Sequence, residues 1–407
     1  MRLQLSDMKK LELLLVLLCL ALAGHAQTDS TALRKSSLKK FTREVEANFL
    51  SSYYHQEGDN AAVTGGIGTE KLTDVSNVII VNVPLDSIRS IGFYGGADIY
   101  SSASTDNIDN NVSSASSSDL RSFATFSYNR LNLQRNERYG LRLGFSVEYD
   151  YTSFSLGGSY TKEWNDGNTE FTAVGQAFFD NWKLIYPIEL RSSVELPSSQ
   201  RQSFNGQLIF SQILTRRLQM SLSAEAVYMK GLLSTPFHRV YFADAVTPDI
   251  ERLPSDRLKI PLSVRFNYYP FDFMVLRSYY RYYQDDFGIS GNTAELELPL
   301  KVSQVITLSP FYRYHTQTAS DYFAPYAQHL SSEEFYTSDY DLSALSSHKY
   351  GMGVKYFPFY GVARSRPFLS SQRVFMFKYI ELRGAYYERS TGLKSFVGSL
   401  NLGFSLK

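Results

Sequence analysis

The chain has 407 residues with a formal net charge of +1 at pH 7, and 43% of its residues are hydrophobic. The near-zero net charge gives no electrostatic reason to expect nucleic acid as a partner. Aromatic residues are abundant, at 15% of the chain with 30 Tyr and 28 Phe, which favours β-strands and the aromatic girdles of membrane barrels.

The N-terminus carries the pattern of a secretory signal. Two lysines precede an apolar run from Leu11 to Leu22, and Gly24 and Ala26 place small residues at the positions that a signal peptidase reads. We predict a signal peptide over residues 1–26, cleaved after Ala26, and a periplasmic leader over residues 27–43. The one cysteine lies inside the apolar run, so we expect neither a disulfide nor thiol chemistry in the mature chain.

The clearest strand pattern extends from Tyr139 to Trp164. Alternate residues from Tyr139 to Tyr149 are apolar or aromatic, and the residues between them are small or polar. The alternation resumes at Phe154. A strand of about ten residues with one apolar face and aromatic ends is typical of an outer-membrane barrel, and a soluble antiparallel sheet is the alternative.

Similar stretches recur along the chain, which predicts an all-β fold. We expect a transmembrane antiparallel β-barrel of about 16 strands over residues 44–407, or of 14 strands if residues 45–84 form a plug. The predicted strands are 45–54, 77–84, 89–100, 119–129, 139–149, 153–164, 169–180, 203–214, 217–230, 257–269, 272–284, 293–302, 304–315, 348–358, 374–387 and 394–406.

The connectors between these strands sort by length. Barrels of this type alternate short periplasmic turns with longer external loops. The predicted outer loops are 55–76, 101–118, 181–202, 231–256 and 315–347, and the predicted inner turns are 84–88, 165–168, 215–216, 270–271 and 303. The exceptions are a long inner connector, 359–373, and short outer ones, 150–152 and 388–393.

Three segments carry a family resemblance: Ser51–Gly58 continuing into Ala62–Glu70, Tyr279–Asp286, and Phe311–Ala319 continuing into Asp321–Phe323. They resemble the bacterial family labelled domain of unknown function number 3570, which is common in Bacteroidetes. The resemblance implies an outer-membrane barrel and supplies no reaction. Genes of the family are associated with extracytoplasmic thioredoxin-like and flavin-transferase neighbours, so it also implies redox-linked traffic.

Inward-facing charges form the best candidate site. Strand alternation directs into the lumen Arg277 and Arg281 on 272–284, Glu295 and Glu297 on 293–302, and Arg313 on 304–315. A hairpin centred near Gly288 would set Arg281 opposite Glu295. This ladder is either a charged constriction that selects solutes or a network that braces the wall. We favour the brace, because matched charges neutralise each other.

Other motifs carry weaker signals. The loop from Gly65 to Thr69 lacks the lysine and the following helix of a phosphate loop, so we expect a close-packed loop or plug. Residues Asp106 to Asn110 lack the glycine and glutamate of a calcium loop. The histidines are dispersed, so no metal site is expected, although a Ser/His hydrolase in the barrel wall could use His348.

We therefore predict a non-enzymatic outer-membrane barrel that serves as a conduit or scaffold for small-solute passage. The alternatives are a partner-binding receptor that acts through loops 231–256 and 315–347, and an outer-leaflet lipid hydrolase. No cofactor is expected. The expected partners are outer-membrane lipid, the barrel-assembly machinery and periplasmic redox proteins, and nucleic acid is not among them.

Overall fold

A computed structural model of the chain describes residues 44–103, 118–190, 197–365 and 374–407. The predicted signal peptide with its cleavage site at Ala26, the leader over 27–43 and the calcium-loop candidate at Asp106 to Asn110 lie outside these residues.

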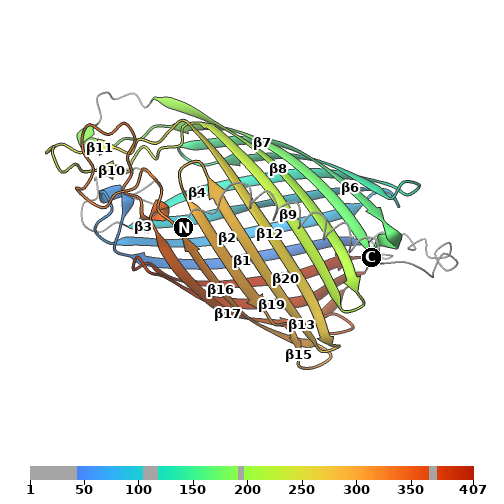
Figure 1. The fold of residues 1–407 in the computed structure, drawn as a ribbon. Coiled ribbons are helices and arrows are strands. Elements are labelled where there is room, and N and C mark those ends of the chain that lie inside the picture. Colours follow the sequence, from blue (N-terminus) through green and yellow to red (C-terminus); the bar gives the residue numbers. More distant parts are fainter. Residues whose placement is uncertain (1–43, 104–117, 191–196, 366–373) are drawn as a thin grey trace, which may run out of the picture. The chain divides into compact units, whose positions relative to one another are not determined.

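The described residues form an antiparallel barrel of 16 strands, which pairing between the first and last strands closes (Figure 1). Two of these 16 spans are interrupted: β14 and β15 both pair with β13 and β16, and β17 and β18 both pair with β19. The wall strands are β1 (Val45–Gly58), β2 (Glu70–Pro84), β3 (Arg89–Ala103), β4 (Ser118–Asn132), β5 (Glu137–Val147), β6 (Tyr151–Trp164), β7 (Thr169–Lys183), β8 (Ser198–Thr215), β9 (Leu218–Gly231), β12 (Asp256–Phe271), β13 (Met274–Asp285), β14 (Ser290–Glu297), β15 (Leu300–Lys301), β16 (Ile306–Gln317), β17 (Leu345–Tyr356), β18 (Ala363–Ser365), β19 (Phe375–Arg389) and β20 (Lys394–Leu406).

Helical structure in the described part of the chain consists of short 3-10 turns. These are η2 (Ala62–Thr64), η3 (Asn165–Gly167), η4 (Ile188–Leu190) and η5 (Tyr340–Leu342), each of three residues. None of the helices in this part is long and apolar enough to span a membrane.

Each of the 16 predicted strands corresponds to one span of the wall, and the predicted all-β barrel is confirmed. The alternative of a plug over residues 45–84 is wrong, because β1 pairs with β20 and β2 pairs with β3 in the wall. The predicted loop 55–76 is too long, since β1 and β2 continue pairing to Gly58 and Glu70. Polar pairs such as His55 with Thr73 extend these strands, and an apolar alternation cannot detect them.

The two faces of the wall differ sharply in exposure. On β5, Phe145 and Val147 are 53% and 54% exposed, whereas Ser146 between them is 9% exposed. On β6, Leu156 is exposed and Ser155 is buried. Apolar side chains therefore cover the outer face and small polar ones face the lumen, as a bilayer around the barrel requires.

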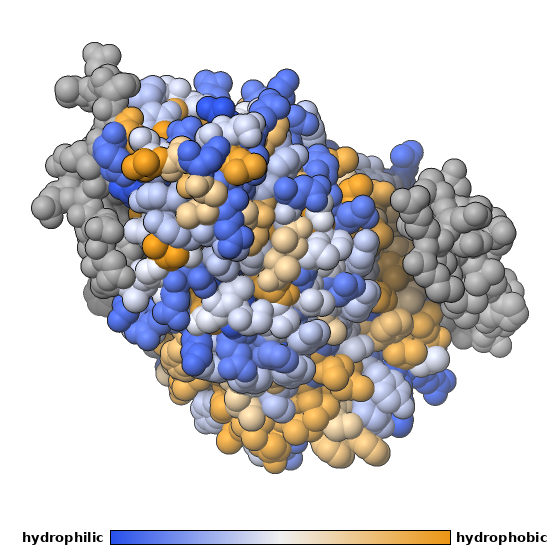
Figure 2. All heavy atoms as spheres, turned by 60° about the vertical axis from the view of Figure 1, so that its left-hand side comes forward, coloured by the Kyte–Doolittle hydropathy of each residue, from blue (hydrophilic) through white to orange (hydrophobic). Residues whose placement is uncertain are grey.

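Successive strands alternate in direction, so every second connector lies at the same end of the barrel. Long connectors share one of the two ends. We call residues 59–69, 232–255 and 318–344 the loop cap; they include η2, η5 and the small pair β10 (Arg239–Val240) with β11 (Asp249–Ile250). Figure 2 turns this end toward the viewer and shows it mainly hydrophilic, with hydrophobic residues gathered on the wall below. Val240 and Tyr336 are nevertheless buried inside it, so the loops pack together.

Candidate functional site

The ladder predicted from the sequence lies on β13, β14 and β16, which are neighbours in the wall. Arg277 Nη1 lies 2.9 Å from Glu297 Oε2, and Arg313 Nη2 lies 2.5 Å from Glu295 Oε2. Arg383, from β19, places Nη2 2.5 Å from the other oxygen of Glu297. Both glutamates of the ladder therefore have arginine partners.

Arg281 departs from the prediction. It is paired in register with Thr293, so its predicted place opposite Glu295 is wrong. The hairpin is centred at Phe287 instead of Gly288. Moving the centre of the hairpin by one residue shifts the residue opposite Arg281 by two positions, from Glu295 to Thr293. The carboxylate of Asp285 sets this turn, because its Oδ1 accepts the backbone N–H of Phe287 at 3.1 Å.

The ladder continues onto two strands that the sequence interpretation did not include. Lys349 and Lys355 on β17, with Glu381 and Arg383 on β19, lie on the faces opposite exposed outward residues. Glu381 lies 3.7 Å from Lys355 Nζ and 3.8 Å from Arg383 Nη1. The alternation within 348–358 and 374–387 contains this information, so the same face assignment would have found them.

Several inward cations have no acidic partner. Lys259, Arg265, Arg281 and Lys349 form no ion pair with any carboxylate of the described residues. The Cζ atoms of Arg265 and Arg281 instead lie 5.2 and 5.8 Å from the ring centroids of tyrosines on β13. Stacking on an aromatic face leaves the guanidinium charge in place, so this side of the lumen keeps unneutralised positive charge.

The opposite side of the lumen is lined by small polar residues together with larger aromatic and charged ones, such as Phe123 and Asp98. A cavity of about 290 Å³ touches β2 to β7, and its lining includes Ser76, Thr125, Ser146, Ser155 and Gln176. These side chains are shorter than the arginines and lysines that they face across the barrel, so they leave space beside this wall.

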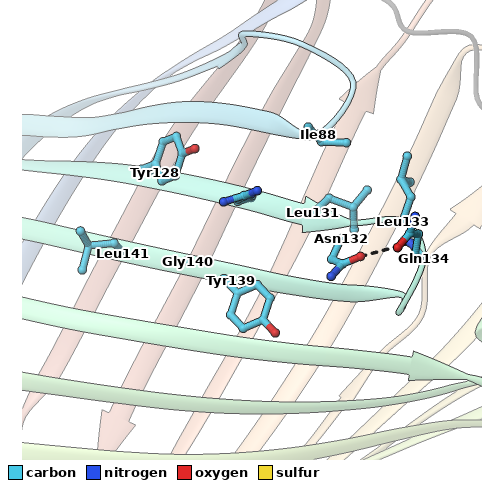
Figure 3. Close-up of a pocket in the computed structure, with 10 residues that line it drawn as sticks. Ile88, Tyr128, Leu131, Asn132, Leu133, Gln134, Tyr139, Gly140 and Leu141 are labelled. Atoms are coloured by element: carbon cyan, nitrogen blue, oxygen red, sulfur yellow. Dashed lines mark hydrogen bonds between the residues drawn. The ribbon is translucent and has the colours of Figure 1, made fainter.

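A larger hollow, of about 780 Å³, lies beside the turn between β4 and β5 (Figure 3). Tyr128, Tyr139 and Leu141 line it, and all three are exposed on the outer face of the wall. The hollow therefore belongs to the outer face of the wall near the short-turn end.

Contacts between distant loops hold the loop cap together. Arg239, 7% exposed, donates through Nη1 to the carbonyl of Val63 at 2.8 Å and forms an ion pair with Glu189. Arg252 and Tyr336 exchange two backbone hydrogen bonds. The three connectors of the loop cap are thereby fixed against one another at the mouth of the barrel, and Arg239 also joins them to η4.

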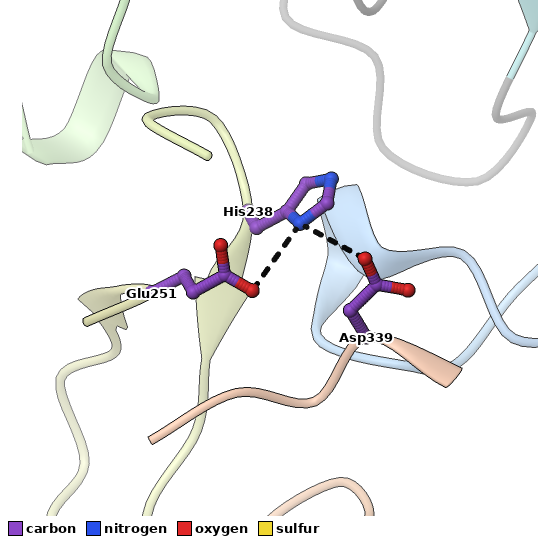
Figure 4. A group of neighbouring side chains, drawn as sticks. All are labelled: His238, Glu251 and Asp339. Atoms are coloured by element: carbon purple, nitrogen blue, oxygen red, sulfur yellow. Dashed lines mark ion pairs between the residues drawn. The ribbon is translucent and has the colours of Figure 1, made fainter. Parts of the chain in front are cut away.

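His238, Glu251 and Asp339 converge inside the cap (Figure 4). His238 Nδ1 lies 3.7 Å from Glu251 Oε1 and 3.8 Å from Asp339 Oδ2, which is too long for hydrogen bonds. His238 directly precedes β10, Glu251 directly follows β11, and Asp339 is the N-cap of η5. Sequence reasoning missed them, because no short spacing connects residues that lie so far apart in the chain.

The electrostatics of this group are coupled. Burial lowers the pKa of His238, but the neighbouring carboxylates outweigh burial and hold the pKa of that imidazole above its usual value. Burial raises the pKa of Glu251, and the histidine with the hydrogen bonds to this carboxylate outweighs burial, so the pKa is lowered overall. Burial raises the pKa of Asp339 to about 6.

The contacts of the loop from Gly65 to Thr69 and of His348 test two weaker predictions from the sequence. Gly65 and Gly66 have φ angles of 82° and 88°, and a Cβ on Gly66 would lie 2.7 Å from the carbonyl oxygen of Ser338. The expected close-packed loop is confirmed. His348 shares a 2.7 Å hydrogen bond with the Tyr312 hydroxyl, and no described serine forms a hydrogen bond with its ring, so the wall lacks a Ser/His pair at this histidine.

Comparison with known proteins adds a family and a fold. The profile of the family described as "Protein of unknown function (DUF3570)" matches residues 101–362. No curated protein matches the sequence.

Solved structures of outer-membrane barrels resemble the fold. The siderophore receptor PirA from Acinetobacter baumannii has a TM-score of 0.45 and 12% identity, covering 86% of this chain and 54% of the receptor. OpdK from Pseudomonas aeruginosa, solved with vanillate, has a TM-score of 0.40 and 6% identity, covering 89% of this chain and 98% of OpdK. The TodX monoaromatic hydrocarbon channel has a TM-score of 0.37 and 10% identity, covering 89% and 88%. This chain spans about half the length of the siderophore receptors.

Proposed function

The chain belongs to the DUF3570 family of proteins of unknown function, as the sequence resemblance predicted, and from the geometry of its lumen we propose that it is an outer-membrane conduit for small anionic solutes.

The outer wall supports a location in the outer membrane. Exposed apolar side chains such as Leu141, Phe145 and Leu156 cover the face that β5 and β6 turn away from the lumen. Closure of the sheet leaves no unpaired strand edge, which is the condition for a β-structure to span a bilayer. The predicted signal peptide would deliver the chain across the inner membrane. We place the loop cap outside the cell and the short turns in the periplasm.

The observation that carries the solute class is an excess of cations on one wall of the lumen. From β12 to β19, lysines and arginines on the inward face outnumber carboxylates. The inward cations include Arg257, Lys259, Arg265, Arg277, Arg281, Lys301, Arg313, Lys349, Lys355, Arg383 and Arg389, and the inward carboxylates include Asp285, Glu295, Glu297 and Glu381.

This excess supports each of the two interpretations of the ladder for different residues. Arg277 and Arg313 brace the wall through their glutamates, as the matched-charge interpretation expects. Arg281 and Lys349 lack such partners among the described residues, and their charges remain available to a solute. A confined positive potential concentrates anions and repels cations, and guanidinium groups bind carboxylates and phosphates in a bidentate manner.

The opposite wall supports passage along the barrel. The cavity beside Ser76, Ser155 and Gln176 has hydroxyl and amide groups in its lining, and its charged lining residues are Arg121 and Asp98. A small anion can keep hydrogen bonds to hydroxyl and amide groups on this side while the basic wall supplies attraction. In this conduit the basic wall attracts the anion, and the opposite wall supplies hydrogen bonds that replace those to water.

Reversal potentials in a planar bilayer test the proposal. Purified protein under a KCl gradient should pass chloride in preference to potassium. Replacing Arg281 or Lys349 with glutamine should lower this preference, and the double variant should lower it further. Neither side chain forms an ion pair in the described part of the wall, so the melting temperature should change little.

Arg130 provides the matched control. It lies on β4 on the same face as the exposed Phe126 and Tyr128, so Arg130→Gln removes an equal charge from outside the lumen and should leave selectivity unchanged. A cation-selective pore, an absence of conductance above the lipid background, or an equal effect of Arg130→Gln and Arg281→Gln would contradict the proposal.

A further inference from the structure

We propose that His238, Glu251 and Asp339 form a binding site for a divalent transition-metal ion, with Zn²⁺ or Mn²⁺ as the fitting ions. The ion would join residues 232–255 to residues 318–344 and so tie together two of the loops that cover the mouth of the barrel.

The spacing of the donor atoms fits such an ion. The nearest nitrogen and oxygen atoms of the three side chains all lie within 4.8 Å of one another, with His238 Nδ1 3.7 and 3.8 Å from the two carboxylates. An ion bound tetrahedrally at about 2.1 Å separates its ligands by about 3.4 Å. The two distances from His238 Nδ1 are within a few tenths of an ångström of this separation, and the two carboxylates, which lie within 4.8 Å of each other, would close around the ion.

Burial and charge point to an ion rather than to solvent. The side chains of Glu251, His238 and Asp339 are 2%, 15% and 24% exposed. His238 Nδ1 is a buried atom with no hydrogen-bond partner among the described residues, and it is directed between the two carboxylates (Figure 4). No lysine or arginine of the described residues pairs with either acid. One buried and one partly buried carboxylate beside one imidazole carry negative charge that a divalent ion neutralises.

Hydrogen bonds around the group hold its ligands in place. The Thr337 hydroxyl donates to Glu251 Oε1 at 2.5 Å and accepts the backbone N–H of Asp339 at 3.0 Å. The backbone N–H of Asp341 donates to Asp339 Oδ1 at 2.8 Å, which leaves Oδ2 facing the histidine. The backbone N–H of Glu251 donates to the carbonyl of His238 at 2.9 Å. Such second-shell bonds orient metal ligands.

The donor set selects the class of ion. One imidazole nitrogen with two carboxylate oxygens suits Zn²⁺, Mn²⁺ and related ions, whereas Ca²⁺ and Mg²⁺ prefer oxygen ligands alone. Three protein ligands leave a fourth position for water. The competing possibility is a protonated histidine that bridges the two acids without a metal, and the experiment below separates the two.

The test uses the full chain, purified in detergent and stripped with a chelator. Isothermal titration with Zn²⁺ should show one bound ion per chain, and Co²⁺ in its place should give the visible absorption of a coordinated ion. Zn²⁺ should also slow proteolytic cleavage within 318–344. Asp339→Asn and Glu251→Gln preserve shape and should each weaken binding at least tenfold, while heat-modifiable migration on gels shows that the barrel has folded.

Glu333→Gln is the matched control. This carboxylate also lies beside a histidine of the cap, because Glu333 Oε2 and His329 Nδ1 are 2.5 Å apart, but no third ligand completes that pair among the described residues. Zn²⁺ affinity should be unchanged in Glu333→Gln. The proposal is overturned if the wild-type chain binds no Zn²⁺ stoichiometrically, which is the result expected of a histidine bridge, or if Asp339→Asn and Glu251→Gln bind as tightly as the wild type.

Discussion

Glu297 is held between Arg277 and Arg383, each of which places a nitrogen within 3 Å of a different oxygen of the same carboxylate. Arg277 lies on the neighbouring strand β13, whereas Arg383 reaches over from β19, with β16 and β17 between β14 and β19. One carboxylate thus connects strands across much of the basic wall, and it has two arginine partners where Glu295 has Arg313.

This relationship predicts which ladder residues stabilise the barrel. Arg277→Ala and Glu297→Ala should each lower the free energy of unfolding. A double-mutant cycle of these two changes should give a coupling energy of about 0.5–1 kcal/mol, because Arg277, like Arg383, is partly exposed to solvent. Urea unfolding in lipid vesicles measures the coupling. Additive effects of the two changes would contradict the brace.

The corrected register supplies a second prediction. Arg281 and Glu295 are not paired, so Arg281→Ala and Glu295→Ala should be additive within about 0.3–0.5 kcal/mol. Arg313→Ala with Glu295→Ala should instead show coupling, because these side chains form an ion pair. The same unfolding measurements on both pairs compare them directly. If Arg281 and Glu295 were coupled and Arg313 and Glu295 were not, Arg281 would lie opposite Glu295, as the sequence predicted, and the described register would be wrong.

The face assignment predicts opposite responses from two neighbouring residues of β7. Ala177 shares its face with the exposed Phe179, and Gln176 lines the lumen cavity. Ala177→Arg places a cation against lipid near the middle of the strand, at a cost of roughly 2–4 kcal/mol. Gln176→Arg should cost clearly less, because the lumen is polar. The yield of folded, heat-modifiable barrel measures both, and equal losses would mean that the faces are misassigned.

The structure of the barrel wall can be predicted from the sequence to a greater extent than that of the loop cap. Period-two alternation is local, so every span of the wall could be predicted, as could the inward direction of Arg277 or Glu297. The register could not, because it depends on how Asp285 closes its turn around the buried Phe287. The loop cap has no periodic sequence pattern, and contacts such as that of His238 with Asp339 join segments that are distant in the chain.

The periplasmic redox partners expected from the family resemblance stay predictions.

Topology predicts which segments are accessible on intact cells. Protease or an epitope tag should reach 232–255 and 318–344, which leave the barrel at the loop-cap end. Tags in the turns at 216–217 or 302–305 should be detected only after the outer membrane is opened, because those turns lie at the other end. Surface detection of the short turns would invert the proposed orientation without changing the fold.

The packing of the cap predicts that one buried arginine controls the mouth of the barrel. Arg239→Met keeps an unbranched apolar stem but removes the hydrogen bond to the carbonyl of Val63 and the ion pair with Glu189. An unsatisfied buried carbonyl costs about 1–3 kcal/mol, and this cost falls on the loops, since the wall keeps its interstrand hydrogen bonds. Cleavage within the cap should therefore accelerate and single-channel conductance should rise, while the melting temperature of the barrel changes little.

Arg252→Met is the control for this change, because it makes the same substitution in the same loop. The Arg252 side chain is exposed and rests over the ring of Tyr336 with Cζ 5.8 Å from the centroid, and its structural contacts are backbone hydrogen bonds that the substitution preserves. It should leave both cleavage and conductance near wild-type values. If Arg239→Met accelerates cleavage without raising conductance, the cap is folded as described but does not restrict the pore, so solute would enter the lumen beside the cap.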